Sequence, residues 1–328
     1  MGPRKWGVRM ILCSGEALID MLPRVSERGE PAFAPYSGGA VFNTAIALGR
    51  LGAPVSFFSG LSTDLFGAQL IAALDASGVS ADRAARSDRP TTLAFVQLAE
   101  GQARYAFYDE GTAGRMLRDT DLPQVGPEIA AAFFGGISLA VEPCGTAYET
   151  LMLELSTRAS GPVTMIDPNV RPGFVADEPA YRARIGRMIA AADIVKISDE
   201  DLHWLEGPGD PAALARGMLG GEALANDAQG RGPRLVCLTR GAEGALGVTE
   251  ADEVFVPARK VEVVDTVGAG DTFNAGVLAG LNRAGVLSRA GLAGLSREDI
   301  EAALSLGIRA AAVTVSRAGA NPPWSEEL

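Results

Sequence analysis

The stretch Asp265-Thr-Val-Gly268-Ala269-Gly270-Asp271-Thr-Phe carries the strongest signal in this sequence, just before an apolar run with helical spacing. Gly268 and Gly270 allow a sharp turn and a close approach of the backbone to a ligand, because glycine has no Cβ. A helix that begins here leaves its first amide N–H groups unpaired, which predicts an anion site. Asp271 falls in the first helical turn, where the dipole favours an ionised carboxylate that can accept a proton. A capped helix start without catalytic function has the same local pattern.

Two further groups of residues near the N-terminus could bind a small polar molecule. Gly38 and Gly39 precede a predicted helix and leave room for a ligand, and Asn43 follows one turn later with both a donor and an acceptor. Asp20 lies between the apolar residues Ile19 and Met21. If it is buried, its carboxylate needs hydrogen-bond partners, and two sugar hydroxyls would supply them. A tight strand-to-helix turn and an Asp at a strand edge are the alternatives that the local pattern leaves open.

Apolar runs and helical patterns alternate along the chain, which predicts an α/β fold with a mostly parallel sheet covered by helices on both faces. Strands are expected at 10–13, 55–59, 132–135, 163–167, 194–197 and 235–239, with extended chain at 254–263. Helices are expected at 38–51, 65–77, 146–159, 180–191, 269–284 and 297–312, and a helix-and-loop connection at 207–232. The alternating runs 91–98 and 103–108 predict a hairpin in a half-exposed sheet.

Composition and charge further limit the partners and the compartment that we expect for this protein. The chain has 328 residues, 47% of them hydrophobic, and a net charge of −11, so it is expected to fold around a large core. Its acidic balance predicts no nucleic-acid partner and no membrane surface as partner, since both attract Lys/Arg clusters. An odd set of three cysteines without CxxC spacing indicates buried thiols, and no signal peptide or membrane-length apolar stretch is present. We therefore expect a cytoplasmic protein.

Several catalytic classes are excluded or disfavoured. A single histidine, His203, has no nearby motif that would support a catalytic triad or a zinc site. The sequence has no GxxxxGK[ST] loop, which excludes a P-loop NTPase, and no N-terminal GxGxxG unit of a dinucleotide fold.

Taken together, these motifs resemble those of the ribokinase-like (PfkB) carbohydrate kinases, and among them most closely the fructokinases. Gly38-Gly39-Ala-Val-Phe-Asn43 is similar to the N-terminal signature of that family, and Asp265-Thr-x-Gly268-Ala269-Gly270-Asp271-Thr to its C-terminal signature, about 220 residues later. Asp167-Pro-Asn-x-Arg171 and Lys196-Ile-Ser-Asp-Glu200 are similar to segments of its fructokinase and ketodeoxygluconate kinase branches. The resemblance covers nearly all of residues 10–325.

The resemblance implies a three-layer αβα sandwich with a mostly parallel central sheet and a small β-sheet lid. The kinase domain would span residues 10–328, with lid segments at approximately 16–37 and 91–110, and residues 1–9 would be an N-terminal extension. The implied activity is ATP-dependent phosphorylation of the primary hydroxyl of a sugar. ATP and Mg²⁺ would be required, and some relatives also bind a monovalent cation such as K⁺.

The resemblance also implies a role for each matching residue. Asp271 would be the general base, and the amides of Gly268, Ala269 and Gly270 would form the anion hole. The sugar would contact Asp20, Gly38, Gly39, Asn43 and Arg171. ATP would contact Ser198, Thr239, Gly241 and Gly244. Asp201 would reach Mg²⁺ through water, although the family motif Asn-x-x-Glu is here Ser198 and Asp201. A monovalent cation would be held by Asp265, Val267, Thr314, Arg317 and Gly319.

Three rival functions remain at this stage. A ketodeoxygluconate kinase is the rival within the family, although the acidic pair Asp109-Glu110 after the second lid strand favours a neutral sugar. A catalytically impaired sugar- or nucleotide-binding protein is suggested by Ser198, Asp201 and Ile308, where the family usually has other residues. A nucleotide-dependent oxidoreductase is the third. The exposed lid strands also suggest a homodimer that forms through the lid.

Overall fold

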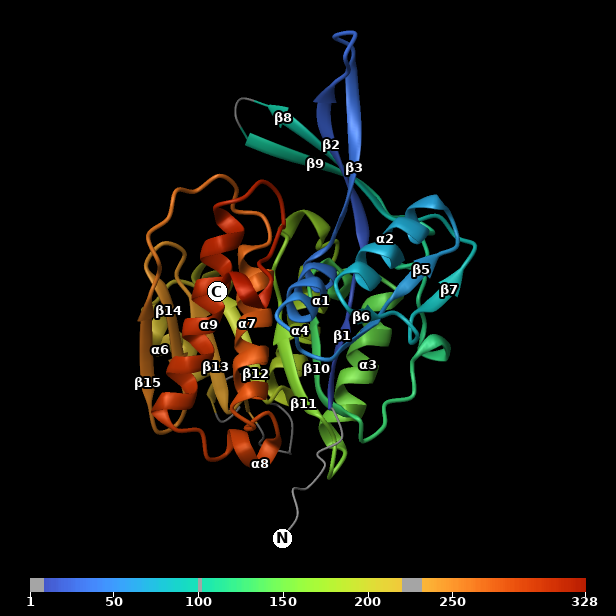
Figure 1. Cartoon of the computed structure of the whole chain (residues 1–328). Coiled ribbons are helices and arrows are strands. Elements are labelled where there is room, and N and C mark those ends of the chain that lie inside the picture. Colours follow the sequence, from blue (N-terminus) through green and yellow to red (C-terminus); the bar gives the residue numbers. More distant parts are fainter. Residues whose placement is uncertain (1–8, 100–101, 220–231) are drawn as a thin grey trace.

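The computed structural model describes residues 9–99, 102–219 and 232–328, and a nine-stranded sheet forms the centre of this part of the chain (Figure 1). The strands, in their order across the sheet, are β15 (Glu253–Pro257), β14 (Gly244–Val248), β13 (Leu235–Thr239), β12 (Ile194–Ser198), β11 (Val163–Asp167), β10 (Ile129–Gly135), β1 (Met10–Ser14), β4 (Val55–Phe58) and β6 (Val79–Ser80). The pairs from β13 to β6 are parallel, and β14 and β15 add an antiparallel edge. The inner strands are apolar on both faces, as burial between two helical layers requires.

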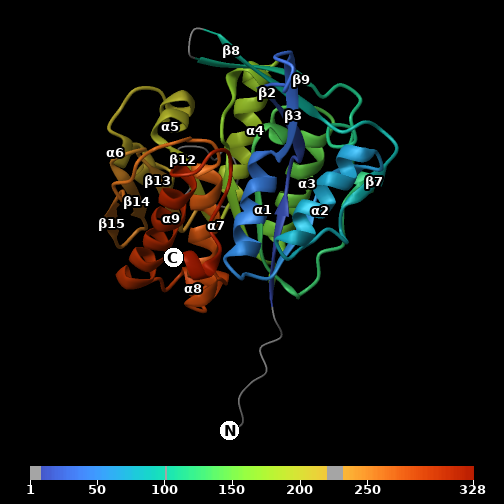
Figure 2. The ribbon, with the colours of Figure 1, turned by 45° about the horizontal axis from the view of Figure 1, so that its top comes forward.

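Helices cover both faces of this sheet (Figure 2). One face packs against α1 (Ala40–Arg50), α2 (Leu65–Ala76), α7 (Ala269–Arg283), α8 (Arg289–Leu292) and α9 (Arg297–Val315). The other face packs against α3 (Cys144–Thr157), α4 (Glu178–Ala191), α5 (Asp199–Glu206) and α6 (Pro211–Gly217). Each face has its own apolar core, so the predicted three-layer αβα arrangement is confirmed. Within the described residues, none of the helices is long and apolar enough to cross a bilayer.

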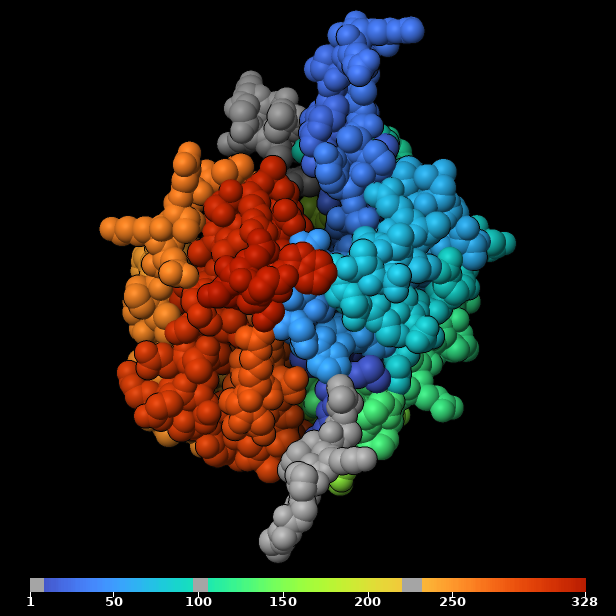
Figure 3. All heavy atoms as spheres, in the orientation of Figure 1, coloured from blue at the N-terminus to red at the C-terminus, as the bar shows by residue number. Residues whose placement is uncertain are grey.

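A second, small sheet stands over the edge of the large sheet where its parallel strands end (Figure 1). Its strands, in order, are β3 (Pro31–Gly38), β2 (Leu18–Val25), β8 (Leu93–Ala99) and β9 (Gln102–Tyr108). The β2–β3 hairpin projects from the body of the molecule in the space-filling view (Figure 3). The short pair β5 (Gly60–Ser62) and β7 (Ala85–Ser87) lies beside α2, near the connection from the large sheet to β8. Phe107 of β9 makes an edge-to-face contact with Phe174, which brings the small sheet against the body.

Most expected elements are present with bounds shifted by one to three residues. The missed elements are mostly very short: β5, β6, β7 and α8 have two to four residues each. β14 was missed because its sequence Gly-Ala-Leu-Gly-Val has little strand propensity, and α5 because it is short and polar. The extended run expected at 254–263 ends as a strand at Pro257. The helix-and-loop interpretation of 207–232 holds for α6, whereas 220–231 lie outside the described residues, as do residues 1–8 of the expected extension.

The packing of α7 against α9 decides where the glycine-rich turn sits. The two helices approach so closely that a Cβ added to Gly276 would lie 2.4 Å from the Cα of Gly307. A Cβ on Gly280 would lie 2.7 Å from the Cα of Ala303. Small residues on this face therefore set the separation of the helices and, through it, the position at which α7 begins.

We predict that Gly276→Ala lowers the free energy of unfolding by about 1–3 kcal/mol, because the added methyl forces the two helix backbones apart. Thermal unfolding followed by circular dichroism measures this change. Gly217→Ala is the matched control, since a Cβ on Gly217 at the end of α6 meets no atom of the described residues within 4 Å. An unchanged melting temperature for Gly276→Ala would contradict the close-packing argument.

Candidate active site

The glycine-rich turn begins α7 as the sequence predicts. Gly268 is the N-cap residue with φ 77° and ψ 3°, a left-handed conformation that glycine adopts without strain. A Cβ there would also lie 2.7 Å from the Cβ of Ala320. Ala269, Gly270 and Asp271 follow as the first three helical residues. The amide of Ala269 donates to the carbonyl of Thr266 at 3.3 Å, whereas those of Gly270 and Asp271 have no partner among the described residues. The turn thus presents backbone N–H groups and the positive end of the helix dipole.

Asp271 is buried, with 7% of its surface exposed, and its carboxylate Oδ2 accepts a hydrogen bond of 2.9 Å from Asn43 Nδ2 on α1. Burial is the main cause that raises the pKa of Asp271 to about 7, and the charge of Asp167 adds to it, whereas the Asn43 bond and the Lys196 charge lower it. The expectation that the helix dipole keeps this carboxylate ionised is therefore too simple, because desolvation is the larger effect. A group with a pKa near 7 is suited to accept a proton at neutral pH.

Asp20 lies directly beside the double glycine. A Cβ on Gly38 would be 2.2 Å from Asp20 Oδ2, so glycine is required wherever this carboxylate keeps its position. Gly39 has φ 109° and is the N-cap of α1, the helix that carries Asn43. Burial raises the pKa of Asp20 to about 6, and among the described residues its carboxylate has no hydrogen-bond partner. Two carboxylates, Asp20 and Asp271, thus flank the beginning of α1.

A buried glutamate that the sequence analysis missed holds this arrangement together. Glu16 follows β1, and its carboxylate accepts hydrogen bonds from the amides of Ala40, at 2.9 Å, and Ser138, at 3.3 Å. Burial raises its pKa. Because Ala40 is the first residue of α1, Glu16 satisfies an unpaired donor of that helix and fixes it to the loop after β10. The signal in the sequence was a glutamate directly after a buried strand.

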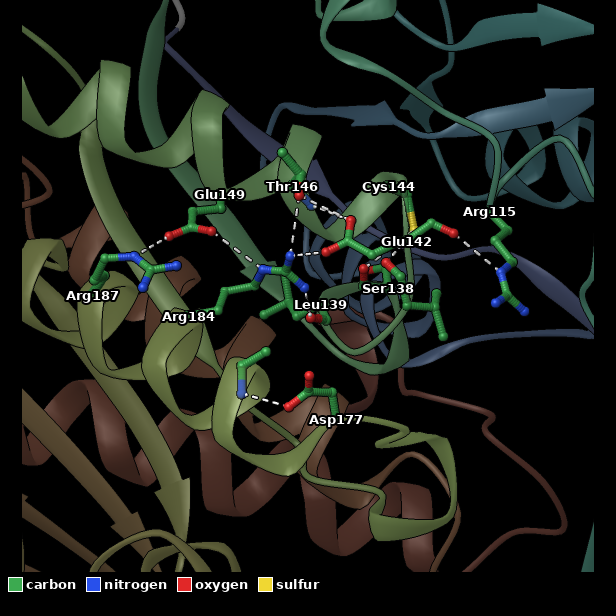
Figure 4. Close-up of polar contacts among 12 residues, drawn as sticks. Arg115, Ser138, Leu139, Glu142, Cys144, Thr146, Glu149, Asp177, Arg184 and Arg187 are labelled. Atoms are coloured by element: carbon green, nitrogen blue, oxygen red, sulfur yellow. Dashed lines mark hydrogen bonds and ion pairs between the residues drawn. The ribbon is translucent and has the colours of Figure 1, made fainter.

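An arginine network secures the other side of this loop (Figure 4). Arg184 of α4 donates to the carbonyl of Leu139 at 2.9 Å and pairs with the carboxylates of Glu142 and Glu149. Arg187 completes the network with a 2.6 Å bond to Glu149. The loop that carries Ser138 is therefore tied to both α3 and α4, and Glu16 has a rigid partner.

Beneath the first turn of α7 lies a buried polar trio from three elements. Lys196 Nζ of β12 lies 3.0 Å from Asp167 Oδ2 of β11, and Asn274 Nδ2 of α7 donates to the same oxygen at 2.7 Å. The Lys196 and Asp167 side chains are only 5% and 2% exposed. In the sequence, Lys196 and Asp167 were noted only as parts of longer family-like segments, without a role of their own. A lysine inside an apolar strand is itself a signal, because such a charge requires a partner.

Asp201, Ser198 and Arg171 lie near this trio. The hydroxyl of Ser198 caps α5 by accepting the amide of Asp201 at 3.0 Å, which explains serine at this position as a helix cap. Burial raises the pKa of Asp201 to about 6, the charge of Asp167 adds to this, and the charges of Lys196 and Arg171 oppose it. The Arg171 side chain is exposed and donates to the carbonyl of Val170.

The described residues contain no group of three His, Cys, Asp or Glu side chains that could hold a metal by themselves. Mg²⁺ is usually bound through one or two carboxylates together with phosphate oxygens and water. Asp201 provides one carboxylate of that kind, whereas both oxygens of Asp167 already accept hydrogen bonds from Asn169, Lys196 and Asn274. The residues present therefore fit a phosphate-bound Mg²⁺.

The segment resembling a nucleotide loop forms the turn between β13 and β14. Thr239 ends β13 and Gly244 begins β14, with Arg240 N bonded to Gly244 O across the turn. Gly241 has φ 48° and Gly244 has φ 134°. A Cβ on Gly244 would also meet Val256 O at 2.2 Å, so this glycine is required by the strand pairing as well.

The residues expected around a monovalent cation are brought to two adjoining loops. Asp265 accepts the amide of Val267 at 3.0 Å with one oxygen and the amide of Gly319 at 2.9 Å with the other. Arg317 N bonds to the carbonyl of Thr314 at 3.1 Å in a turn after α9. Asp265 thus connects the glycine-rich turn to the segment after α9, and both oxygens already have partners.

These residues meet at one edge of the large sheet. Asp167 and Thr239 end strands β11 and β13, and Glu16, Ser138 and Ser198 follow or end β1, β10 and β12. Ligands of open α/β sheets bind at this carboxyl edge of the parallel strands. With an anion-binding turn and a base that titrates near neutrality, the arrangement is that of a group-transfer enzyme acting on a phosphorylated donor.

Comparisons with known proteins agree with this class. The sequence profile of the pfkB family carbohydrate kinases matches residues 8–327. The chain is 53% identical over 289 residues to a fructokinase of Rhizobium leguminosarum bv. trifolii, which covers 88% of this chain and 85% of the relative. It is 32% identical to fructokinase-1 of Oryza sativa subsp. japonica over 97% of this chain and 95% of the relative. The structure of a Xylella fastidiosa fructokinase with bound ATP superposes with a TM-score of 0.83 at 28% identity, over 97% of each chain.

The chain therefore belongs to the pfkB family of carbohydrate kinases. It is an ATP-dependent sugar kinase of the fructokinase-like kind, and the ribokinase-like fold expected from the motifs is confirmed. The rival class of nucleotide-dependent oxidoreductases is excluded by this membership.

We predict that Asp271→Asn gains stability relative to the wild type as the pH rises from 4 to 8. Burial raises the pKa of Asp271 to about 7, so the folded state favours the protonated acid and loses stability as the pH rises from near 4 through 7. Asparagine cannot ionise and avoids this loss. Calorimetric melting temperatures at fixed ionic strength measure the difference between the two proteins, which should be small at pH 4 and largest at pH 8.

The exposed Asp88→Asn is the matched control, and its difference from the wild type should not follow this profile. A pH-independent difference for Asp271→Asn would mean that the carboxylate ionises in the folded state as it does in the unfolded chain.

Proposed function

We propose that this enzyme transfers the terminal phosphoryl group of ATP to the primary hydroxyl of a neutral sugar, with fructose as the first candidate. The observation that carries the proposal is the buried Asp271 carboxylate, with a pKa near 7, beside the helix-start amides of Gly268, Ala269 and Gly270. Of these three amides, that of Ala269 donates to Thr266, and the other two have no partner in the described part of the chain. A base and an anion hole at adjacent positions are what in-line phosphoryl transfer to an alcohol needs.

In the proposed step, the sugar oxygen attacks the terminal phosphorus as its proton passes to Asp271. The bond from phosphorus to the bridging oxygen breaks, and ADP leaves with that electron pair. The amides of Gly268, Ala269 and Gly270 hold the negative charge on the transferred group. Asn43 keeps the Asp271 carboxylate oriented through its 2.9 Å bond.

We assign sugar recognition to the residues around the start of α1. Asp20, whose carboxylate has no partner in the described part of the chain, would accept hydrogen bonds from two hydroxyls. The backbone of Gly38 and Gly39 allows the sugar to approach, and the Asn43 carbonyl oxygen remains available as an acceptor. Exposed Arg171 would meet an anionic group of a ligand at the mouth of the site.

ATP would lie along the carboxyl edge of the sheet, past Ser198 and the turn of Thr239, Gly241 and Gly244. Bound Mg²⁺ would neutralise charge on the phosphates, and Asp201 would contact it through water. K⁺ is the monovalent cation that we propose beside Asp265. The resemblance to the family implies that the carbonyls of Val267, Thr314, Arg317 and Gly319 would also contact it. There it would stabilise the loop that leads into the anion hole.

We propose that residues 10–328 form one kinase domain, in which the small sheet, built from segments near 16–37 and 91–110, acts as a lid. Its inner face carries Asp20, and Phe107 on that same face contacts Phe174 of the body. A lid that carries one of the sugar-binding groups would close as the sugar binds and exclude competing water.

A ketodeoxygluconate kinase is the second candidate, and the charges near the lid argue against it. Asp109, directly after β9, pairs with Arg115 at 3.0 Å, which neutralises that arginine. The neighbouring Glu110 leaves a negative charge that would repel a carboxylate sugar. We also propose a cytoplasmic location, since all three cysteines are buried free thiols.

The proposal is tested with a panel of sugars, including fructose and 2-keto-3-deoxygluconate, with ATP and Mg²⁺ and with or without K⁺. Coupled ADP detection should show the highest kcat/KM with fructose. Asp271→Asn should lower kcat by about 10²–10⁴-fold, because general-base catalysis is worth roughly that factor. Sugar binding in calorimetry with no turnover of any sugar would overturn the proposal in favour of a binding protein.

We further propose that the outer face of the lid pairs with a second copy of the chain. Phe33, Phe95 and Tyr108 form a row across this face, with ring centroids 5.0 Å and 5.4 Å apart, and Tyr108 is 63% exposed. An exposed aromatic row on a sheet is a typical interaction surface.

Sedimentation velocity should show a dimer for the wild type and a monomer for Phe33→Ser/Tyr108→Ser. Phe255→Ser, at an exposed position on β15 far along the sheet, is the matched control and should remain dimeric. A monomeric wild type at micromolar concentration would contradict this surface.

A further inference from the structure

The ammonium group of Lys196 lies against the anion-binding turn. A Cβ built on Gly270 would lie 3.2 Å from Lys196 Nζ, the one atom of the described residues outside its own helix within 4 Å. Gly270 is the last of the three residues whose amides form the proposed anion hole. The positive charge is therefore placed at the turn itself and not elsewhere along β12.

Lys196 is held in this position by partners on two other elements. Asp167 accepts its one hydrogen bond to the described residues, at 3.0 Å, and Asn274 of α7 donates to the same carboxylate oxygen at 2.7 Å. An ammonium group has three donors, so two remain without a protein partner although the side chain is only 5% exposed. A buried charged donor that lacks acceptors is costly unless a ligand supplies them.

The charges around Lys196 also favour the binding of an anionic ligand beside it. Burial would lower its pKa, but the charges of Asp167, Asp201 and Asp271 outweigh this and raise it, so the ammonium form is retained. The thiol of Cys237 on β13 is the remaining titratable group that faces it, and burial keeps that thiol protonated. Lys196 is therefore a fixed positive charge among acidic groups, beside the site where an anion would bind.

We propose that Lys196 is a catalytic residue that donates hydrogen bonds to the phosphoryl group during its transfer, with Asp167 and Asn274 as the residues that position it. This inference deepens the proposed function and rests on it. The amides of Gly268–Gly270 would contact the phosphoryl group from the helix start, and Lys196 would contact it from the sheet. A fixed cation contributes most when charge moves onto the transferred oxygens in the transition state.

The alternative is a purely structural lysine that compensates for Asp167. Lys196→Met alone does not separate the two, because it leaves a buried carboxylate without its partner, which is strongly destabilising. The double variant Lys196→Met/Asp167→Asn removes both charges and preserves the volumes. It is the informative protein, because a structural pair replaced as a unit can be close to neutral.

The decisive measurement is the ratio of two affinities in calorimetry, with Mg²⁺ and the sugar present. The first is the affinity for ADP with aluminium fluoride, which is an analogue of the phosphoryl group in the transition state. The second is the affinity for ADP alone. We expect the double variant to bind ADP as the wild type does but to lose about 10²–10³-fold in affinity for the mimic, the range for removal of one anion-hole donor. Its kcat at pH 8.5, where Asp271 is ionised, should fall by a similar factor.

The pH profile provides a second readout. The groups that face Asp271 are Asn43, Glu16, Asp167 and Lys196, and the Lys196 charge lowers its pKa. Lys196→Met should therefore move the acidic limb of kcat to higher pH. In the double variant the loss of the Asp167 charge opposes this shift, so the limb should return toward that of the wild type while the plateau stays low.

Arg289→Met is the matched control. Arg289 pairs with Asp193 at 3.2 Å, directly before β12 and at the opposite end of that strand from the site. This variant should lower the melting temperature and leave the affinity ratio unchanged. A double variant whose ratio changes less than tenfold would overturn the role of Lys196 while the sugar kinase activity of the wild type stands. A wild type that phosphorylates no sugar would overturn the proposed function and this inference with it.

Discussion

The structure depends on one contact between residues that are 228 positions apart, the hydrogen bond from Asn43 to Asp271. It joins the start of α1 to the start of α7, and the hydroxyl of Thr44 adds a 3.2 Å bond to the backbone of Asp271. The proposed sugar-binding residues belong to the start of α1 and the proposed phosphoryl-binding amides to the start of α7. Because both helices pack on the same face of the sheet, any change in their spacing would separate the sugar from the anion-binding turn.

The electrostatics of the site result from burying several acids around few positive charges. Desolvation is the first cause that raises the pKa of each of Glu16, Asp20, Asp201 and Asp271. An empty site of this kind would repel a nucleotide triphosphate, in a chain whose net charge is already −11. In the proposed site, three positive groups would offset this repulsion. They are the backbone amides of the glycine-rich turn, the Lys196 ammonium and a divalent cation bound to the phosphates. In the proposed reaction, the burial that raises the pKa of Asp271 therefore also requires those positive groups.

Much of this architecture could be predicted from sequence, because the motifs are local. The glycines at 268 and 270, Asp271 and the double glycine at 38–39 reveal themselves through turn chemistry and helix starts. The partners of those residues could not be predicted, because Glu16, Ser138 and Asn274 become meaningful only when distant segments meet. The pKa of Asp271 illustrates the difference: the helix start is visible in the sequence, whereas the burial that outweighs the dipole is created by α1 and the sheet.

The hydrogen bonds that Asp265 accepts from the amides of Val267 and Gly319 have a consequence for the order in which the chain is synthesised. The segment beyond α9 also holds α1, because Asn321 and Pro322 accept from Arg50 and Trp324 stacks on its guanidinium. On the ribosome, α1 emerges long before its partners exist, so the early half of the nascent chain has no means of assembling a phosphate site. The contacts that hold the glycine-rich turn and α1 in place therefore form only after residues beyond 319 have been synthesised.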